Sequence, residues 1–348
     1  MIEKGKAIGF PFSYERLFME QITPKYYHLF RCIAADCPDS CCKEWAVDVD
    51  EESAARYRSL PGDLGDRLRS VLQDTPDGTV MTIENGRCPM WRQDGLCRIQ
   101  AELGHDALCQ VCQSFPRLRH DYGDFVELGL ELSCPEAARL ILTTEDSLST
   151  ETLPGGEPGD YDQEVMDTLR RSREEFLAYL RSTDNIPNAL AVLLLYTCEV
   201  QSELDGGEQA SLDPQYALQQ GAKFAKGGDM EGIFRFFSSL EILTPQWRSI
   251  LAAGPTSPNW DPRLKNFLVY LIRRYWLQAV SDYDLVGRAK LCIIACLLLS
   301  AIPGDILETA QLFSKEIEND PDNVEAILDG AYQDPALTDL GLLGLLFK

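Results

Sequence analysis

Apolar residues recur at helical spacing through the second half of the chain. Between Asp162 and Leu180 they fall mostly three or four residues apart, and Pro262–Val280 gathers large apolar side chains on one helical face. Leu291–Ala301 is apolar almost throughout, which suits a helix that is buried on all sides. The pattern therefore predicts an all-helical C-terminal domain over residues 161–348.

The first part of the chain has a weaker and more varied pattern. Thr79–Glu84 combines β-branched residues with rough alternation and predicts a strand. Glu51–Leu72 is helical in composition, with a break at Pro61-Gly62. A hairpin is expected within Leu118–Leu132, around the turn formers Asp121-Tyr122-Gly123-Asp124. This half should therefore contain short helices and little strand.

A polar segment separates the two halves. Pro135–Leu142 predicts a helix with Ser133 as its N-cap. Residues 143–160, TTEDSLSTETLPGGEPGD, contain no basic residue and are typical of a linker. We therefore expect a mainly α (α+β) fold, with a cysteine-rich metal- or cluster-binding module over residues 1–142, a linker over 143–160 and a helical domain over 161–348.

Charge and hydropathy narrow the classes of partner. The chain has 348 residues and a formal net charge of −23. Nucleic-acid binding needs Lys and Arg to neutralise phosphates, so no nucleic-acid partner is expected. The acidic balance favours solubility and a lysine-bearing partner. No apolar stretch reaches the roughly 20 residues of a membrane span, and no signal peptide is evident. We expect a cytoplasmic protein without membrane segments, and the oligomeric state is left open.

Cysteine is concentrated in the first part of the chain. Nine of the twelve cysteines lie between Cys32 and Cys134. Such crowding indicates either a disulfide framework or a metal or iron–sulfur site, and disulfides are rare in the cytoplasm. Thiolates are soft ligands that suit zinc, copper(I) and iron–sulfur clusters. The candidate metal ligands are Cys37, Cys41, Cys42, Cys88, Cys97, Cys109 and Cys112, with Cys32 and Cys134 as further candidates.

The spacing of the cysteines limits the chemistry. Cys37/Cys41 and Cys109/Cys112 have the close spacing of paired metal ligands. The Cys-x3-Cys-x2-Cys arrangement of radical enzymes is absent, and no glycine-rich nucleotide fingerprint occurs. The thiols outnumber the ligands of one four-coordinate site, so two centres, or one centre plus structural cysteines, are both open. The remaining cysteines are expected in the core: Cys198, Cys292 and Cys296.

Short motifs surround these cysteines. They are Cys41-Cys42-Lys43-Glu44-Trp45, Cys88-Pro89, Leu108-Cys109-Gln110-Val111-Cys112, Phe115-Pro116-Arg117 and Ser133-Cys134-Pro135-Glu136-Ala137-Ala138-Arg139. Together they resemble the flagellin lysine N-methylase family over about residues 22–142. The core is also similar to the wider CxxCxxCC family of zinc- or iron-chelating proteins.

The resemblance implies methyl transfer from S-adenosylmethionine to surface lysines of flagellin, by an enzyme with a 4Fe-4S cluster; zinc is the alternative metal. Displacement of a sulfonium methyl by a neutral amine needs alignment and lysine deprotonation, and it does not require a metal. A cluster could therefore be structural, bind the donor or take part in transfer. The alternative function is a non-catalytic zinc- or iron-binding scaffold, in which a metal staples a loop-rich module.

Candidate catalytic residues lie near the first motif. Asp48 and Asp50, beside Trp45, could hold or deprotonate a lysine ammonium, although Asp50 also fits the role of a helix cap. Tyr26, Tyr27 and Trp45 could line a pocket for methyl-bearing cations through cation–π contact, or cover a core.

Two arginines and one aromatic residue are candidates for donor binding. Arg117 and Arg139 could hold a carboxylate with two hydrogen bonds, or form structural ion pairs with nearby acids. Trp45 is the third candidate at this site.

Overall fold

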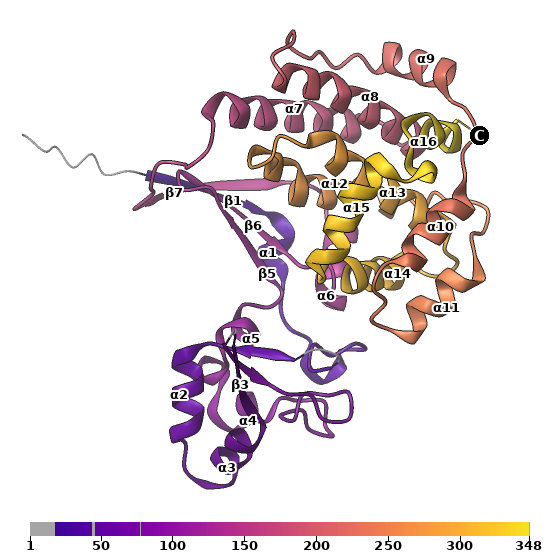
Figure 1. The fold of residues 1–348 in the computed structure, drawn as a ribbon. Coiled ribbons are helices and arrows are strands. Elements are labelled where there is room, and N and C mark those ends of the chain that lie inside the picture. The colour runs from indigo at the N-terminus through magenta and orange to yellow at the C-terminus, as the bar shows by residue number, and fades with distance from the viewer. Residues whose placement is uncertain (1–17, 44–45, 77, 348) are drawn as a thin grey trace, which may run out of the picture.

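The computed structural model describes residues 18–43, 46–76 and 78–347, and its helices outnumber its strands, as predicted. Figure 1 shows a large part, rich in helices, and a smaller part below it. We call residues 42–114 the cysteine lobe, and residues 18–29 and 117–347 the body. Residues 30–41 form the junction loop between them. Because helices outnumber strands in the described residues, the mainly α (α+β) class is confirmed.

A four-stranded sheet forms one side of the body. Its strand order is β5-β6-β1-β7, with β1 parallel to β6 and antiparallel to β7. Strands β5 and β6 form the hairpin expected within residues 118–132, with Gly123 in its turn at φ 93°. The strands are β1 (Phe18–Pro24), β5 (Arg117–Asp121), β6 (Phe125–Leu130) and β7 (Leu148–Pro154).

Strand β7 lies within residues 143–160, the segment that the sequence predicts as a linker. It pairs with β1 from Phe18↔Pro154 to Pro24↔Leu148. Nearly all its side chains are exposed, because β7 is the edge strand of the sheet. An edge strand that is polar on both faces has no hydrophobic alternation, so its composition resembles that of a loop.

Helices form the rest of the body, and no strand occurs in the described residues after Pro154. Helix α13 lies at their centre, and nearly every side chain in it is buried, including those of Cys292 and Cys296 as predicted. The helices are α1 (Lys25–Leu29), α6 (Pro135–Thr143), α7 (Gln163–Ser182), α8 (Ile186–Leu204), α9 (Pro214–Phe224), α10 (Met230–Ser239), α11 (Pro245–Ala253), α12 (Arg263–Tyr275), α13 (Leu285–Ala301), α14 (Ile306–Phe313), α15 (Pro321–Gln333) and α16 (Asp339–Leu346).

Helix α6 differs from the sequence prediction at its first turn. Its N-cap is Cys134, whereas we expected Ser133. The Ser133 hydroxyl instead donates to Glu131 Oε2 at 3.4 Å. Pro135 at the first helical position fixes φ and lacks an N–H group, so the helix can begin there without a side-chain cap. The apolar face of α6 joins the same core as α7, α8 and α12, which ties this helix to the body.

The cysteine lobe has a separate apolar core. Val47, Tyr57, Leu68 and Met90 are among its buried residues, and it shares none of them with the core of the body. The expected strand and the broken helix are both present. The elements of the lobe are β2 (Val47–Val49), α2 (Glu51–Ser59), α3 (Gly62–Val71), β3 (Leu72–Thr75), β4 (Gly78–Met81), α4 (Arg98–Leu103) and α5 (Gln110–Ser114).

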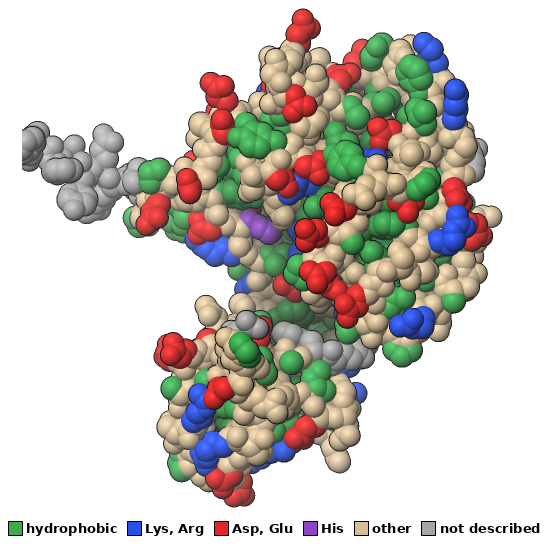
Figure 2. All heavy atoms as spheres, in the orientation of Figure 1, with side chains coloured by type: hydrophobic (Ala, Val, Ile, Leu, Met, Phe, Trp, Pro, Cys, Tyr) green, Lys and Arg blue, Asp and Glu red, His purple; other side chains and the backbone are tan. Residues whose placement is uncertain are grey.

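Asp39 of the junction loop holds the loop against the body. Its Oδ2 accepts a hydrogen bond from Gln311 Nε2 at 2.8 Å and lies 3.4 Å from Lys315 Nζ. Figure 2 shows a notch between the lobe and the body. Within the part of the chain that the structure describes, no helix has the length and apolar character needed to cross a bilayer.

Candidate functional site

Six cysteine side chains line one cavity, five from the cysteine lobe and one, Cys41, from the end of the junction loop. The rest of its wall is mainly apolar and includes Val47, Met81, Met90 and Ile99. All twelve cysteines lie within the described residues, and none of them forms a disulfide. The cavity brings together six of the predicted metal ligands: Cys41, Cys42, Cys88, Cys97, Cys109 and Cys112.

Local backbone geometry aims N–H groups at several of these sulfurs. Cys97 is the N-cap of α4, and the backbone of Gln100 and Ile99 hydrogen-bonds to its thiol. Cys109 occupies the same position before α5. The Cys88 thiol is likewise hydrogen-bonded to the backbone of Met90. Such hydrogen bonds stabilise the thiolate form that binds metals.

Two pairs of thiols are hydrogen-bonded to each other in this cavity. The bond with Cys41 lowers the pKa of Cys42, and the bond with Cys112 lowers the pKa of Cys109. Burial raises the pKa of Cys88 to about 12. Within each pair one thiol therefore loses its proton more readily than its partner, and a bound cation would favour the thiolate form of the rest.

A second group of thiols lies at the junction loop. Cys32 Sγ accepts from Ala34 N at 3.4 Å, and Cys37 Sγ lies 3.3 Å from Asp39 O. Burial, with smaller effects of Cys37 and Cys32, raises the pKa of Cys134 to about 11. The structure thus places Cys32, Cys37 and Cys134 outside the six-cysteine cavity.

Gln311 of helix α14 fixes this arrangement. Its amide donates both to Asp39 Oδ2, at 2.8 Å, and to Ser133 O, at 2.7 Å. It therefore joins the loop that carries Cys37 to the residue before Cys134.

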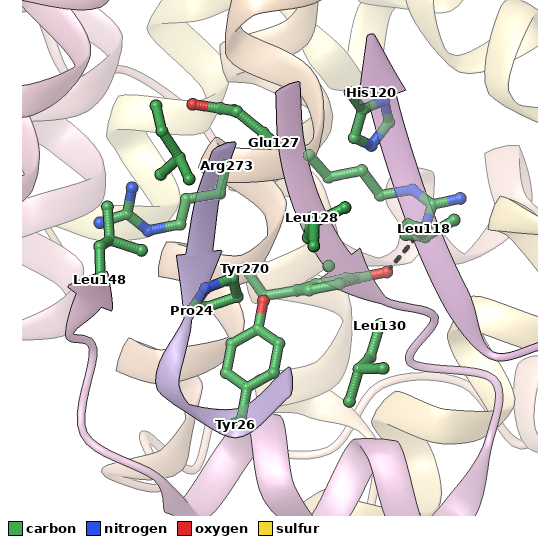
Figure 3. A pocket seen from close by; sticks show the side chains of 13 residues that line it. Pro24, Tyr26, Leu118, His120, Glu127, Leu128, Leu130, Leu148, Tyr270 and Arg273 are labelled. Carbon is green, nitrogen blue, oxygen red and sulfur yellow. Dashed lines mark hydrogen bonds between the residues drawn. The ribbon is translucent and has the colours of Figure 1, made fainter. Parts of the chain in front are cut away.

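A second pocket lies in the body, between the sheet and helix α12 (Figure 3). Its wall includes Tyr26 of α1, His120 of β5, Glu127 of β6 and Tyr270 of α12. Its volume is about 30 Å³. It is therefore a narrow space, with polar groups contributed by several elements.

Sequence comparison identifies the relatives of this chain. A segment of 147 residues is 31% identical to the Flagellar biosynthetic protein FliU of Salmonella muenchen, covering 38% of this chain and 83% of that protein. The chain belongs to the FliU and Lysine-N-methylase family. The Lysine-N-methylases of Salmonella typhimurium and Salmonella choleraesuis are also 31% identical over 147 residues, which is 35% of the length of each. No family model matches the chain, and no solved structure matches it.

The cysteine sulfurs in the cavity of this FliU and Lysine-N-methylase relative suit a soft metal or an iron–sulfur cluster. Across residues 18–43, 46–76 and 78–347, no three His, Cys, Asp or Glu side chains are arranged as a preformed metal site. The chemistry of the set nevertheless fits, because six soft sulfurs share one mainly apolar cavity and backbone donors face several of them. The side chains have to turn toward a metal that binds there.

Neither of the predicted catalytic carboxylates Asp48 and Asp50 lines either pocket. Asp50 accepts from Ser53 N at 2.9 Å and from Gln110 N at 2.8 Å, so it caps α2 and ties α2 to α5. Asp48 is exposed on strand β2. Trp45 lies outside the described residues.

Tyr27 and Arg117 lie together near the junction loop. The Arg117 guanidinium carbon is 5.9 Å from the centre of the Tyr27 ring and 5.2 Å from that of Phe30. Arg139, by contrast, forms an exposed ion pair with Glu136, at 2.7 Å from Nη2 to Oε1. Of the predicted donor-binding residues, only Arg117 is placed beside a predicted aromatic one.

Most of the pocket in the body could not be predicted from the sequence. Tyr26 was expected either to line a pocket for cations or to cover a core, and it does line this pocket. His120 and Tyr270 were missed because they are far apart in the sequence and no motif surrounds them. Only the fold brings β5 and α12 together.

Proposed function

We propose that this protein is a protein-lysine N-methyltransferase that uses S-adenosylmethionine and acts on flagellin. The observation that carries the proposal is the identity with proteins named Lysine-N-methylase and Flagellar biosynthetic protein FliU. The net charge of −23 supports it, because an acidic enzyme attracts a lysine-bearing substrate surface. Figure 2 shows acidic side chains spread over the visible face of the body.

The same proposal assigns an iron–sulfur cluster of the 4Fe-4S type to the cysteine lobe, with zinc as the alternative metal. Its ligands come from the six cysteines of the cavity. When bound, such a cluster supplies Lewis-acidic iron and a compact charged group. The protein supplies the apolar wall that limits water, and the backbone groups of Met90, Ile99 and Gln100 that hold the sulfurs.

Methyl transfer makes two demands that protein residues can meet. The lysine amine must lose its proton before its nitrogen can attack, and the nitrogen must lie in line with the carbon–sulfur bond that breaks. Neither demand involves a metal. The body, with its own core and pocket, is therefore a reasonable place for the amine, while the lobe holds the cluster.

Anaerobically purified full-length protein tests the proposal. We expect iron and acid-labile sulfide in the protein, and mass increments of one methyl group on flagellin incubated with S-adenosylmethionine. Cys97→Ser should lower the iron content, whereas Cys292→Ser, in the core of the body, should leave it unchanged. Stoichiometric zinc without sulfide would remove the cluster from the proposal, and unmodified flagellin would remove the activity.

The alternative is a non-catalytic zinc- or iron-binding scaffold. The separate core of the lobe favours it, because a small core gains much from a metal staple. Bound zinc together with no methyl transfer to any protein of the same cell would support this alternative.

A further inference from the structure

The contact between the sheet and the helices of the body is unusually polar. A sheet normally packs on helices through apolar side chains, and burying charged groups there costs free energy unless they are paired. Here three guanidinium groups lie close to the pocket, and each has a carboxylate partner: Arg173 with Glu127 at 2.5 Å, Arg273 with Asp146 at 3.0 Å, and Arg274 with Glu318 at 3.1 Å. The pocket therefore has no uncompensated positive charge from these arginines.

His120 is an exception among the polar groups that line the pocket. It lies directly opposite Glu127 in the β5–β6 register, yet its ring makes no hydrogen bond within the described part of the chain. Tyr270, by comparison, accepts from Arg274 Nη1 at 3.2 Å and donates to Glu318 Oε2 at 3.0 Å. The imidazole is thus free to bind something that enters the pocket.

The surroundings keep this imidazole neutral. Burial, and then the charge of Arg274, lower the pKa of His120, while Glu127 acts in the opposite direction. The remaining groups around it are phenols and paired ions: Tyr26 of α1, Tyr270 and Arg273 of α12, and Arg173 of α7. Burial also raises the pKa of Tyr26, so that phenol stays protonated. At neutral pH, His120 therefore carries a free lone pair and can accept a proton.

Size and shape decide which reactant fits. A pocket of about 30 Å³ is far smaller than the sites that hold drug-sized ligands, so it does not fit a donor that carries a nucleoside, whereas its size suits the end of a side chain. In Figure 3, Tyr26 and Tyr270 lie toward one end of the pocket, and His120 and Glu127 toward the other. Aromatic rings bind ammonium groups, including methylated ones, through cation–π contact.

We propose that this pocket receives the ε-ammonium group of a substrate lysine, and that His120 is the general base. The inference rests on the proposed methyltransferase function. His120 takes one proton from the ammonium and becomes imidazolium. The neutral amine nitrogen then forms a bond to the sulfonium methyl carbon, and the carbon–sulfur bond breaks with its electron pair going to sulfur. The products are a methylammonium, a neutral thioether and, after His120 releases its proton to water, the original base.

The test compares full-length wild type with His120→Gln. Methyl transfer to flagellin is measured with S-adenosylmethionine as a function of pH. We expect His120→Gln to lower kcat/KM by about 10²- to 10⁴-fold and to remove the acidic limb of the wild-type profile. That limb should lie below the usual histidine range of about 6.5. Added imidazole should restore part of the variant's activity. His105→Gln is the matched control, because that side chain is 55% exposed in the lobe and should leave the profile unchanged.

Each outcome decides between the two proposals. If wild type methylates flagellin and His120→Gln keeps the same rate and acidic limb, His120 is not the general base, and the proposed methyltransferase function stands. If wild type is inactive, both are wrong. If His120→Gln fails to fold, the NMR signals of His120 in wild type are followed on addition of n-butylamine, a lysine side-chain mimic. A saturable shift supports the proposal, and the absence of a shift overturns it.

Discussion

Arg173 of helix α7 and Glu127 of strand β6 form a double hydrogen-bonded ion pair inside the body, at 2.5 Å and 2.8 Å. Their side chains are 3% and 10% exposed. Burial acts to raise the pKa of Glu127, but the Arg173 guanidinium outweighs it and holds the pKa below the usual range of a glutamate. The pair therefore joins the sheet to the helices and keeps a carboxylate charged beside the pocket.

Removal of one partner should destabilise the body strongly. Arg173→Met leaves the Glu127 carboxylate buried without its cation, so we expect the free energy of unfolding to fall by about 3–5 kcal/mol. Chemical denaturation of the metal-loaded protein measures this change. Arg235→Met is the control, because its ion pair with Asp229 is exposed and should contribute less than about 1 kcal/mol. Equal losses in the two variants would contradict the role of burial.

The same pair predicts the pH dependence of stability. The folded pKa of Glu127 is lowered, so its contribution is fully present above the unfolded value of about 4.3 and is lost as pH falls through the folded value. Melting temperatures measured on the acidic side should therefore fall more steeply for wild type than for Glu127→Gln. Parallel curves for the two proteins would argue against this linkage.

Asp50 should contribute to the stability of the lobe at two places. Each carboxylate oxygen accepts a backbone hydrogen bond, one from Ser53 and one from Gln110. We expect Asp50→Ala to destabilise the lobe by about 1–2 kcal/mol, and Asp50→Asn, which retains one acceptor oxygen, to cost less. Hydrogen exchange in α2 and α5 measures both effects. Faster exchange in α2 alone would show that the bond to Gln110 contributes little.

Metal removal should affect the lobe and spare the body. The two parts have separate cores, and the six-cysteine cavity belongs to the lobe. Incubation with a chelator should therefore expose residues 46–112 to protease while α7 to α16 stay protected. Mass spectrometry of the fragments locates the cuts. If the body is digested at the same rate, the two parts are not independent.

Local patterns predicted the elements, but not how distant segments meet. Helix α13 and the β5–β6 hairpin follow from an apolar run and from turn residues, which are local signals. Strand β7 was missed because an exposed edge strand has no apolar face. The cap of α6 was placed one residue early, since a proline can begin a helix without a serine before it.

The cysteines show the same limit. Their spacing indicated paired ligands, and Cys109 and Cys112 are hydrogen-bonded to each other as neighbours in the cavity. Spacing could not separate Cys37 from Cys41, because the junction loop passes between the lobe and the body within these few residues. Cys37 and Cys41 are separated by the way Asp39 contacts Gln311 of helix α14 and Lys315 just after it. These two residues are more than 250 positions away in the sequence, so cysteine spacing carries no sign of the contact.

The sheet of the body has one further consequence. Strand β1 comes before the cysteine lobe in the sequence, and its partners β6 and β7 come after it. The lobe is therefore an insertion between two parts of one sheet, entering through the junction loop and leaving at β5. A cassette of this kind can be exchanged or shortened in evolution, or grafted onto another scaffold, without breaking a strand pair of its host.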